Sequence, residues 1–161
     1  MLERFKVPEK DRVYVAEGQI RTATEAIFRH SGVSVDEAAR STDVLITNDL
    51  RGVESHGVSN MLRHYVADYG TNKLNPTPEF KVVRESKTTM TIDADRALGT
   101  HVGPWAMQHA IDKAKEFGMG AVAVTNSGHL AGCGYYAMMA AQQGMIGHCM
   151  TAGGSHQTVP P

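Results

Sequence analysis

The first half of the chain carries apolar residues at the spacing of amphipathic helices. Three segments show this pattern, at residues 18–32, 34–52 and 59–70. Ser34 precedes Glu37 by three residues, which is the pattern of a capping box at a helix start. Ser59 is the expected N-cap of the third segment. The pattern therefore predicts an N-terminal helical region over residues 1–75.

After a loop punctuated by Pro76 and Pro78, the apolar pattern changes to a period of two residues. The expected elements are strands at 80–86 and 88–95, a helix at 100–118, a strand at 119–124, a helix at 135–144 and a strand at 145–152. The 119–124 run has no polar alternation, so we expect a strand buried on both faces. This order of elements predicts that residues 76–161 form an α/β region, with a mixed sheet covered by helices. The end, "GGSHQTVPP", predicts a loop, and a chain that stops there looks incomplete.

The composition of the chain bears on which kinds of molecule it is expected to bind. The 161 residues include 42% hydrophobic and 20% charged residues, with a net charge of -1. This balance gives no reason to expect nucleic acid or an anionic membrane as a partner. No apolar run approaches the roughly 20 residues that span a bilayer. The two cysteines form neither a CxxC pair nor a disulfide framework, so we expect a cytoplasmic protein.

The stretch "VTNSGHLAGCGYYA" places polar residues directly after the 119–124 strand. Ligands gather at the carboxyl ends of strands in open α/β sheets. His129 lies there, and an imidazole passes protons near neutral pH. Asn126 and Ser127 offer hydrogen bonds to orient the ring or a substrate. The competing interpretation is a histidine that packs or caps a loop.

A second candidate segment is "RGVESHG", residues 51–57, which links two predicted helices. Arg51 suits a bidentate grip on a carboxylate. His56 is a second candidate acid–base group or a substrate ligand, and Ser55 adjoins it. A solvated turn between helices explains the same residues without any function.

Other chemistries have less support. The glycines of residues 128–134 read GxxxGxG and not GxGxxG, so the usual dinucleotide fingerprint is absent. His129 with Cys133, and His148 with Cys149, do not match a standard zinc spacing, so we expect no metal site. Ser127 is not in a GxSxG motif, which argues against a serine hydrolase.

Two stretches taken together resemble a known family. "NDLRGVESHGVSNMLRHYV" and "VTNSGHLAGCGYYAMMAAQQGMIGHCMT" are similar to the type-2 malate/L-lactate dehydrogenases, which include ureidoglycolate, diketogulonate and sulfolactate dehydrogenases. The resemblance runs from about Ile20 to the end of the chain. It implies hydride transfer between NAD or NADP and a small 2-hydroxy or 2-oxo acid, on a fold unlike the Rossmann type. It also implies a dimer with active sites near the subunit interface.

The resemblance also assigns roles to individual residues. The histidine of the family's SHG segment falls on His56, and that of its NSxHxG segment falls on His129. His129 is then the expected acid–base group for the substrate oxygen, and His56 polarises the substrate or shares the proton. The resemblance identifies no nicotinamide-binding residue.

Three departures from the family pattern affect these expectations. Members often carry an arginine four residues after the SHG histidine, where this chain has Asn60; Arg63 is the nearby substitute. The Thr-Asn that commonly follows the last strand is here Thr151-Ala152. Members are also about twice as long. We therefore expect the N-terminal part, or one subunit, of a dehydrogenase whose cofactor half lies in a missing C-terminal half or in a partner chain of a hetero-oligomer. The alternative is a noncatalytic binding or scaffold subunit that keeps the fold.

Overall fold

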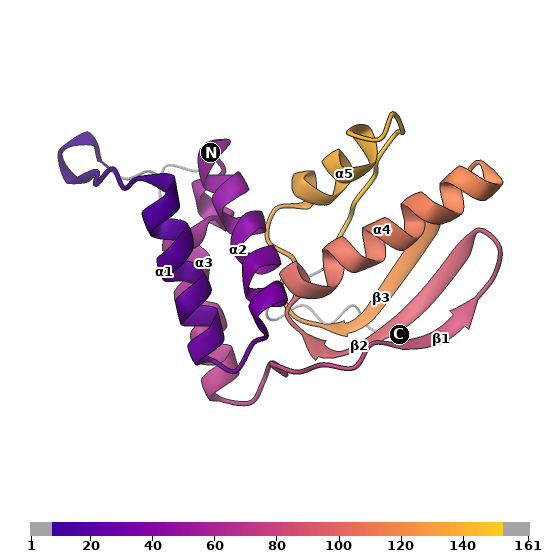
Figure 1. Cartoon of the computed structure of the whole chain (residues 1–161), viewed down its shortest axis with the longest axis horizontal. Helices are drawn as coiled ribbons and strands as arrows, with labels where there is room; N and C mark the ends of the chain where they lie inside the picture. The colour runs from indigo at the N-terminus through magenta and orange to yellow at the C-terminus, as the bar shows by residue number, and fades with distance from the viewer. Residues whose placement is uncertain (1–7, 153–161) are drawn as a thin grey trace.

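A computed structural model describes residues 8–152 of the chain. Three helices stand side by side at one end, and a three-stranded sheet with a long helix across one face forms the other (Figure 1). The elements are η2 (Glu9–Asp11), α1 (Glu17–His30), α2 (Val35–Leu50), η3 (Glu54–His56), α3 (Val58–Gly70), β1 (Lys81–Glu85), β2 (Thr89–Ala97), α4 (Gly99–Phe117), β3 (Ala121–Ser127) and α5 (Cys133–Ala141). The predicted loop "GGSHQTVPP" lies outside the described residues.

The three N-terminal helices confirm the helical pattern of the sequence. Their apolar faces meet in the larger hydrophobic core, where Phe28 and Leu45 are fully buried and Tyr65 is 2% exposed. The same core includes Leu98 and Tyr136 from the α/β region. Side chains from both sides of the boundary at residue 75 therefore share one core, and a division into two domains there stays a prediction.

The two predicted N-caps have different outcomes. Ser34 caps α2 as expected, because its hydroxyl accepts the backbone N–H of Glu37 at 3.4 Å. The cap predicted at Ser59 is wrong, since α3 begins at Val58 with Gly57 as the N-cap residue. The Val58 N–H instead donates to a carboxylate oxygen of Asp49, at 2.8 Å, from the last turn of α2. A side chain from the preceding helix thus replaces the local serine.

This difference predicts unequal effects of two serine substitutions. Ser34→Ala removes a hydroxyl that accepts a helix N–H, and we expect a loss of about 1 kcal/mol of stability. That corresponds to a decrease of roughly 2–4 °C in Tm for a chain of this size. Ser59→Ala is the matched control, because Ser59 is exposed and does not cap α3. Thermal melts followed by circular dichroism measure both. Equal destabilisation by the two variants would contradict the assignment of the caps.

The sheet has the order β1-β2-β3 and is mixed, as predicted. β1 pairs with β2 antiparallel, and β2 pairs with β3 parallel. The buried side chains of β2, Met90, Ile92 and Ala94, pack with Val102 and Ala106 of α4 in a second, smaller core. The observed α/β architecture therefore confirms the predicted fold class.

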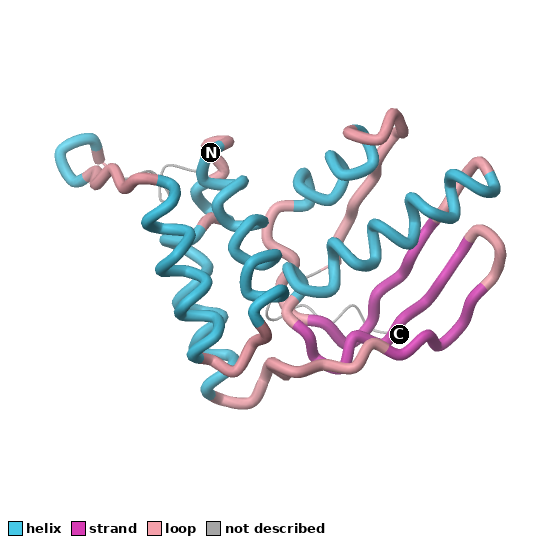
Figure 2. The backbone as a smooth tube through the Cα atoms, in the orientation of Figure 1, coloured by secondary structure: helices cyan, strands magenta, loops and turns pink. Residues whose placement is uncertain are grey.

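Two strand predictions need correction. β3 is not buried on both faces, because Val122 and Val124 are half-buried toward α4 while Ala121 and Ala123 are exposed. The strand predicted at 145–152 is also wrong. After α5 the chain continues as a loop (Figure 2), and within residues 8–152 β3 has β2 as its only ladder partner. An apolar run becomes a strand only where a neighbouring strand satisfies its backbone groups.

Candidate active site

The fold brings together two histidines that lie far apart in the sequence. His56 ends the short helix η3, and His129 lies in the loop that joins β3 to α5. Their imidazole rings are stacked, with centroids 5.4 Å apart and planes 17° from parallel. The two segments chosen from the sequence therefore meet at one place in the molecule.

Each imidazole has a hydrogen-bonding partner at Nδ1. The hydroxyl of Ser55 lies 2.9 Å from Nδ1 of His56. The hydroxyl of Tyr65, from α3, lies 2.8 Å from Nδ1 of His129. The backbone N–H of Ala131 also donates to that nitrogen, at 3.3 Å. These contacts leave Nε2 of both rings as the nitrogen for a substrate.

The surroundings of His129 favour its neutral form. His129 is an exposed residue, yet enough protein surrounds its ring for desolvation to be the largest cause that lowers its pKa. The nearby imidazoles of His56 and His64 lower the pKa further, because a second positive charge is unfavourable there. A carboxylate bound beside these rings would act in the opposite direction and favour the imidazolium.

Close backbone packing fixes both histidine segments. Asn48 of α2 is 4% exposed, and its amide donates to the backbone carbonyl of His56 at 3.1 Å. A Cβ at Gly132 would lie 2.5 Å from the amide oxygen of Asn48. A Cβ at Gly99, the first residue of α4, would lie 2.6 Å from the carbonyl oxygen of His129. The amide of Asn48 and the close approaches at Gly132 and Gly99 thus hold the backbones of the two histidine segments in place.

The SHG segment has its own steric requirement at Gly57. A Cβ there would lie well inside contact distance of the Asp49 carboxylate that caps α3. Burial is the largest cause that raises the pKa of this carboxyl, and the hydrogen bond from Val58 acts against it. The glycine after His56 is therefore required for the packing of α3 against α2.

The other residues singled out from the sequence lie in different surroundings. Arg51 is exposed, and its guanidinium contacts the thioether of Met138 on α5. Arg63 is on the exposed side of α3. Ser127 is the last residue of β3 and pairs with Ala97 across the ladder. The structure thus groups Ser55 with the imidazoles through a hydrogen bond, and it shows no such bond for Arg51, Arg63 or Ser127 within residues 8–152.

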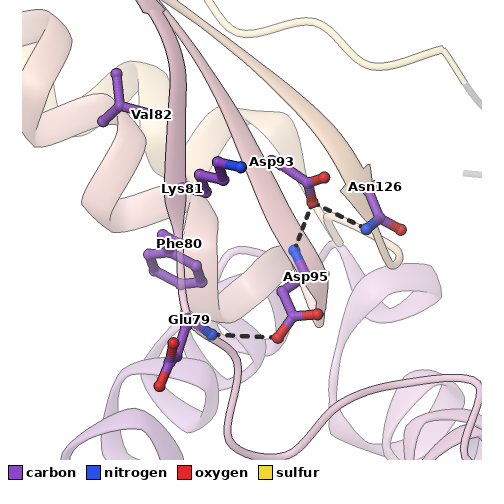
Figure 3. Close-up of a pocket in the computed structure, with 7 residues that line it drawn as sticks. All are labelled: Glu79, Phe80, Lys81, Val82, Asp93, Asp95 and Asn126. Carbon is purple, nitrogen blue, oxygen red and sulfur yellow. Dashed lines mark hydrogen bonds between the residues drawn. The ribbon is translucent and has the colours of Figure 1, made fainter.

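Asn126 belongs to a separate groove on the sheet. Its amide donates to the Asp93 carboxylate at 2.9 Å, and the Asp95 N–H donates to the same oxygen at 2.8 Å. These two hydrogen bonds lower the pKa of Asp93. Asp93, Asp95 and Asn126 line an open groove of about 580 Å³. Figure 3 shows them with the other lining residues, Glu79, Phe80, Lys81 and Val82. Neither imidazole lines this groove.

Three residues near the imidazoles were not among the sequence candidates. Tyr65 matched the apolar stripe of its helix, Asn48 lay inside a predicted helix, and His64 had no assigned role. The available signal in the sequence was a tyrosine or an asparagine on an otherwise apolar helix face. The buried hydroxyl or amide of such a residue needs a hydrogen-bond partner.

Other groups in the described part of the chain do not extend this site. His101 is 3% exposed and pairs with Glu37 at 2.5 Å, so it links α4 to α2.

Within residues 8–152, no cluster of three or more His, Cys, Asp or Glu side chains is arranged to hold a metal ion. No helix in that range combines the length and the apolar character needed to cross a membrane.

Comparison with known proteins finds relatives over most of this chain. Malate dehydrogenase from Pyrococcus abyssi is 40% identical over 148 residues, which are 88% of this chain and 41% of that protein. L-sulfolactate dehydrogenase from Methanocaldococcus jannaschii is 39% identical over 78% of this chain and 36% of its own length. This chain therefore spans about two fifths of the length of these relatives.

Solved structures agree with the sequence matches. Malate dehydrogenase from Pyrococcus horikoshii OT3 superposes with a TM-score of 0.80 at 39% identity, over 82% of this chain and 38% of that one. The family model described as malate/L-lactate dehydrogenase matches residues 15–161. The chain belongs to the malate/L-lactate dehydrogenase family.

Proposed function

We propose that this chain is the N-terminal part, or one subunit, of an NAD(P)-dependent oxidoreductase that acts on a small 2-hydroxy or 2-oxo acid. The observation that carries the proposal is the stacked pair of imidazoles, His56 and His129, at 5.4 Å. Relatives of the chain are named malate, sulfolactate and ureidoglycolate dehydrogenases, which fits this substrate class.

In the proposed reaction, His129 holds or releases the proton of the substrate oxygen through Nε2. Oxidation of a 2-hydroxy acid needs a neutral imidazole that accepts the hydroxyl proton, and reduction of a 2-oxo acid needs an imidazolium that donates one. The lowered pKa of His129 suits the neutral form in the free chain. An anionic substrate favours the imidazolium on binding, so substrate and proton are taken up together.

His56 lies against one side of His129 and is held by Ser55. We assign it to polarise the substrate oxygen or to share its proton. Bound nicotinamide would supply or accept the hydride at the substrate C2. The groove beside Asn126 and the small cavity beside Tyr135 are lined by neither imidazole, so we assign no cofactor-binding residue.

We expect the remaining part of the active site in a C-terminal half or in a partner chain, because this chain spans about two fifths of the length of its relatives. Homo-oligomers or hetero-oligomers both fit this proposal. A cytoplasmic location stays a prediction from the composition, and both cysteines of the chain are free thiols in the structure.

A specific observation favours the alternative of a noncatalytic scaffold subunit. The amide of Asn60 donates to the backbone carbonyl of Glu54 at 2.8 Å. At the position where relatives often carry the carboxylate-binding arginine, this side chain therefore supports the η3 turn. Substrate binding then depends on another cation or on the imidazoles themselves.

The test is an activity assay of the native assembly. We expect the chain purified with its co-expressed partner or C-terminal remainder to oxidise NADH or NADPH with a 2-oxo acid. The 2-oxo acids matching malate, lactate and sulfolactate form the panel, and the chain alone serves as the comparison. Absence of nicotinamide binding in the native assembly, measured by cofactor fluorescence, would favour the scaffold alternative instead.

A further inference from the structure

Tyr65 is a buried residue whose hydroxyl reaches the imidazole that would handle the proton. It lies on α3, is 2% exposed, and places its hydroxyl oxygen 2.8 Å from Nδ1 of His129. The rings lie 6.0 Å apart at 41°, so the contact is a hydrogen bond and not a stack. Nδ1 of His129 is therefore within hydrogen-bond distance of both this hydroxyl and the backbone N–H of Ala131.

These two neighbours of Nδ1 differ in whether they can donate or accept a hydrogen bond. An amide N–H only donates, so Ala131 interacts favourably with Nδ1 only when that nitrogen carries no proton. A hydroxyl donates or accepts, according to how it rotates. Burial is the largest cause that raises the pKa of Tyr65, so the hydroxyl keeps its own proton. The uncharged hydroxyl can therefore hydrogen-bond to Nδ1 whether or not that nitrogen carries a proton.

Acid–base chemistry at Nε2 requires a proton on Nδ1 throughout. The imidazolium carries protons on both nitrogens, and loss of the Nε2 proton to a substrate oxygen leaves the neutral form protonated at Nδ1. The backbone N–H of Ala131 disfavours a proton on Nδ1, because two N–H groups then face each other. The backbone of Ala131 is held in that place at φ 57°, which is uncommon for a residue other than glycine.

We propose that Tyr65 is a positioning residue for His129. The hydroxyl of Tyr65 accepts a hydrogen bond from the protonated Nδ1 and so keeps Nε2 free to exchange a proton with the substrate. The inference rests on the proposed function, since it assigns a role to Tyr65 through His129. The other titratable groups that face His129 are His56 on η3 and His64 on α3. Both disfavour the imidazolium, which makes an acceptor at Nδ1 more important.

The test is an NMR titration of the ring nitrogens of His129 in the wild-type chain, Tyr65→Phe and Tyr69→Phe. Without the hydroxyl, the imidazolium loses its acceptor at Nδ1, while the neutral Nε2–H form keeps the Ala131 N–H. We therefore expect Tyr65→Phe to lower the pKa of His129 and to shift its neutral form toward the Nε2–H tautomer. Tyr69 is a buried tyrosine one turn further along α3, so Tyr69→Phe is the matched control and leaves both unchanged.

In the assembled enzyme, loss of this hydrogen bond predicts a reduction of roughly tenfold in kcat for the 2-oxo acid near neutral pH. The pH above which activity falls also moves lower, because the imidazolium deprotonates earlier. KM is expected to change little. A structural role alone would lower stability without moving the pH profile.

Should Tyr65→Phe fail to fold, 3-fluorotyrosine introduced at position 65 keeps the size and the hydroxyl but weakens it as an acceptor. This substitution is expected to lower the pKa of His129 in the same direction. An unchanged titration of His129 in the folded variant overturns the inference, whichever of the two substitutions is used. That result is distinct from failure of the proposed function, which would appear as a native assembly that neither binds nicotinamide nor reduces a 2-oxo acid.

Discussion

Replacement of His129 by glutamine is expected to lower kcat of the assembled enzyme by roughly 10²- to 10⁴-fold, the usual contribution of a positioned acid–base group. Glutamine retains hydrogen-bonding capacity but exchanges no proton near neutral pH. His129 is an exposed residue and glutamine can still hydrogen-bond to the hydroxyl of Tyr65, so the substitution removes little buried surface. Stability and nicotinamide binding are therefore expected to stay close to wild type.

The measurement is steady-state reduction of a 2-oxo acid, with kcat and KM determined separately. His30→Gln is the matched control, because His30 is an exposed residue at the end of α1. A His129→Gln enzyme with wild-type kcat would exclude His129 as the acid–base group. The imidazole of His56, which stacks on it, would then be the next candidate.

The second large effect is expected from Gly57→Ala. The added methyl group would overlap the Asp49 carboxylate, so either the carboxylate or the start of α3 must move. Overpacking and loss of the cap on Val58 each cost roughly 1–3 kcal/mol. We expect a combined loss of about 2–6 kcal/mol, which lowers Tm by at least roughly 4 °C for a chain of this length.

Gly18→Ala provides a control of opposite sign. Gly18 lies in α1 with open space where a Cβ would be added, so alanine is expected to stabilise the helix by roughly 0.5–1 kcal/mol. Thermal or urea unfolding of both variants measures the difference. A Gly57→Ala chain as stable as wild type would mean that the Asp49 carboxylate does not cap α3 in solution.

Periodicity of the sequence predicted the helices well, because each buries one continuous apolar face. The packing of Phe28, Leu45 and Tyr65 in one core is the physical basis of that success. The strand predicted at 145–152 failed for a different reason. Apolar character shows that a segment prefers burial, but a strand also needs a partner with free backbone groups, and the sequence of one segment does not contain that information.

The candidate site was predictable in part. His129 stood out because polar residues follow an apolar run, and His56 stood out in a polar link between two predicted helices. Their partners did not stand out, because Tyr65 and Asn48 occupy helix positions where an apolar residue would fit the pattern equally well. A local sequence pattern cannot show that a tyrosine on one helix reaches a loop more than sixty positions away. The Ser59 prediction failed similarly, since the true cap comes from Asp49 on another helix.

The amide of Asn48 has a further consequence for how the protein responds to heat. It donates to the carbonyl of His56 and packs closely against Gly132, from a helix whose Val44 and Leu45 are fully buried. The geometry of the imidazole pair is therefore only as persistent as the packing of α2. If the helical core loosens before the sheet does, the two rings separate while most of the secondary structure is still intact, and inactivation precedes unfolding.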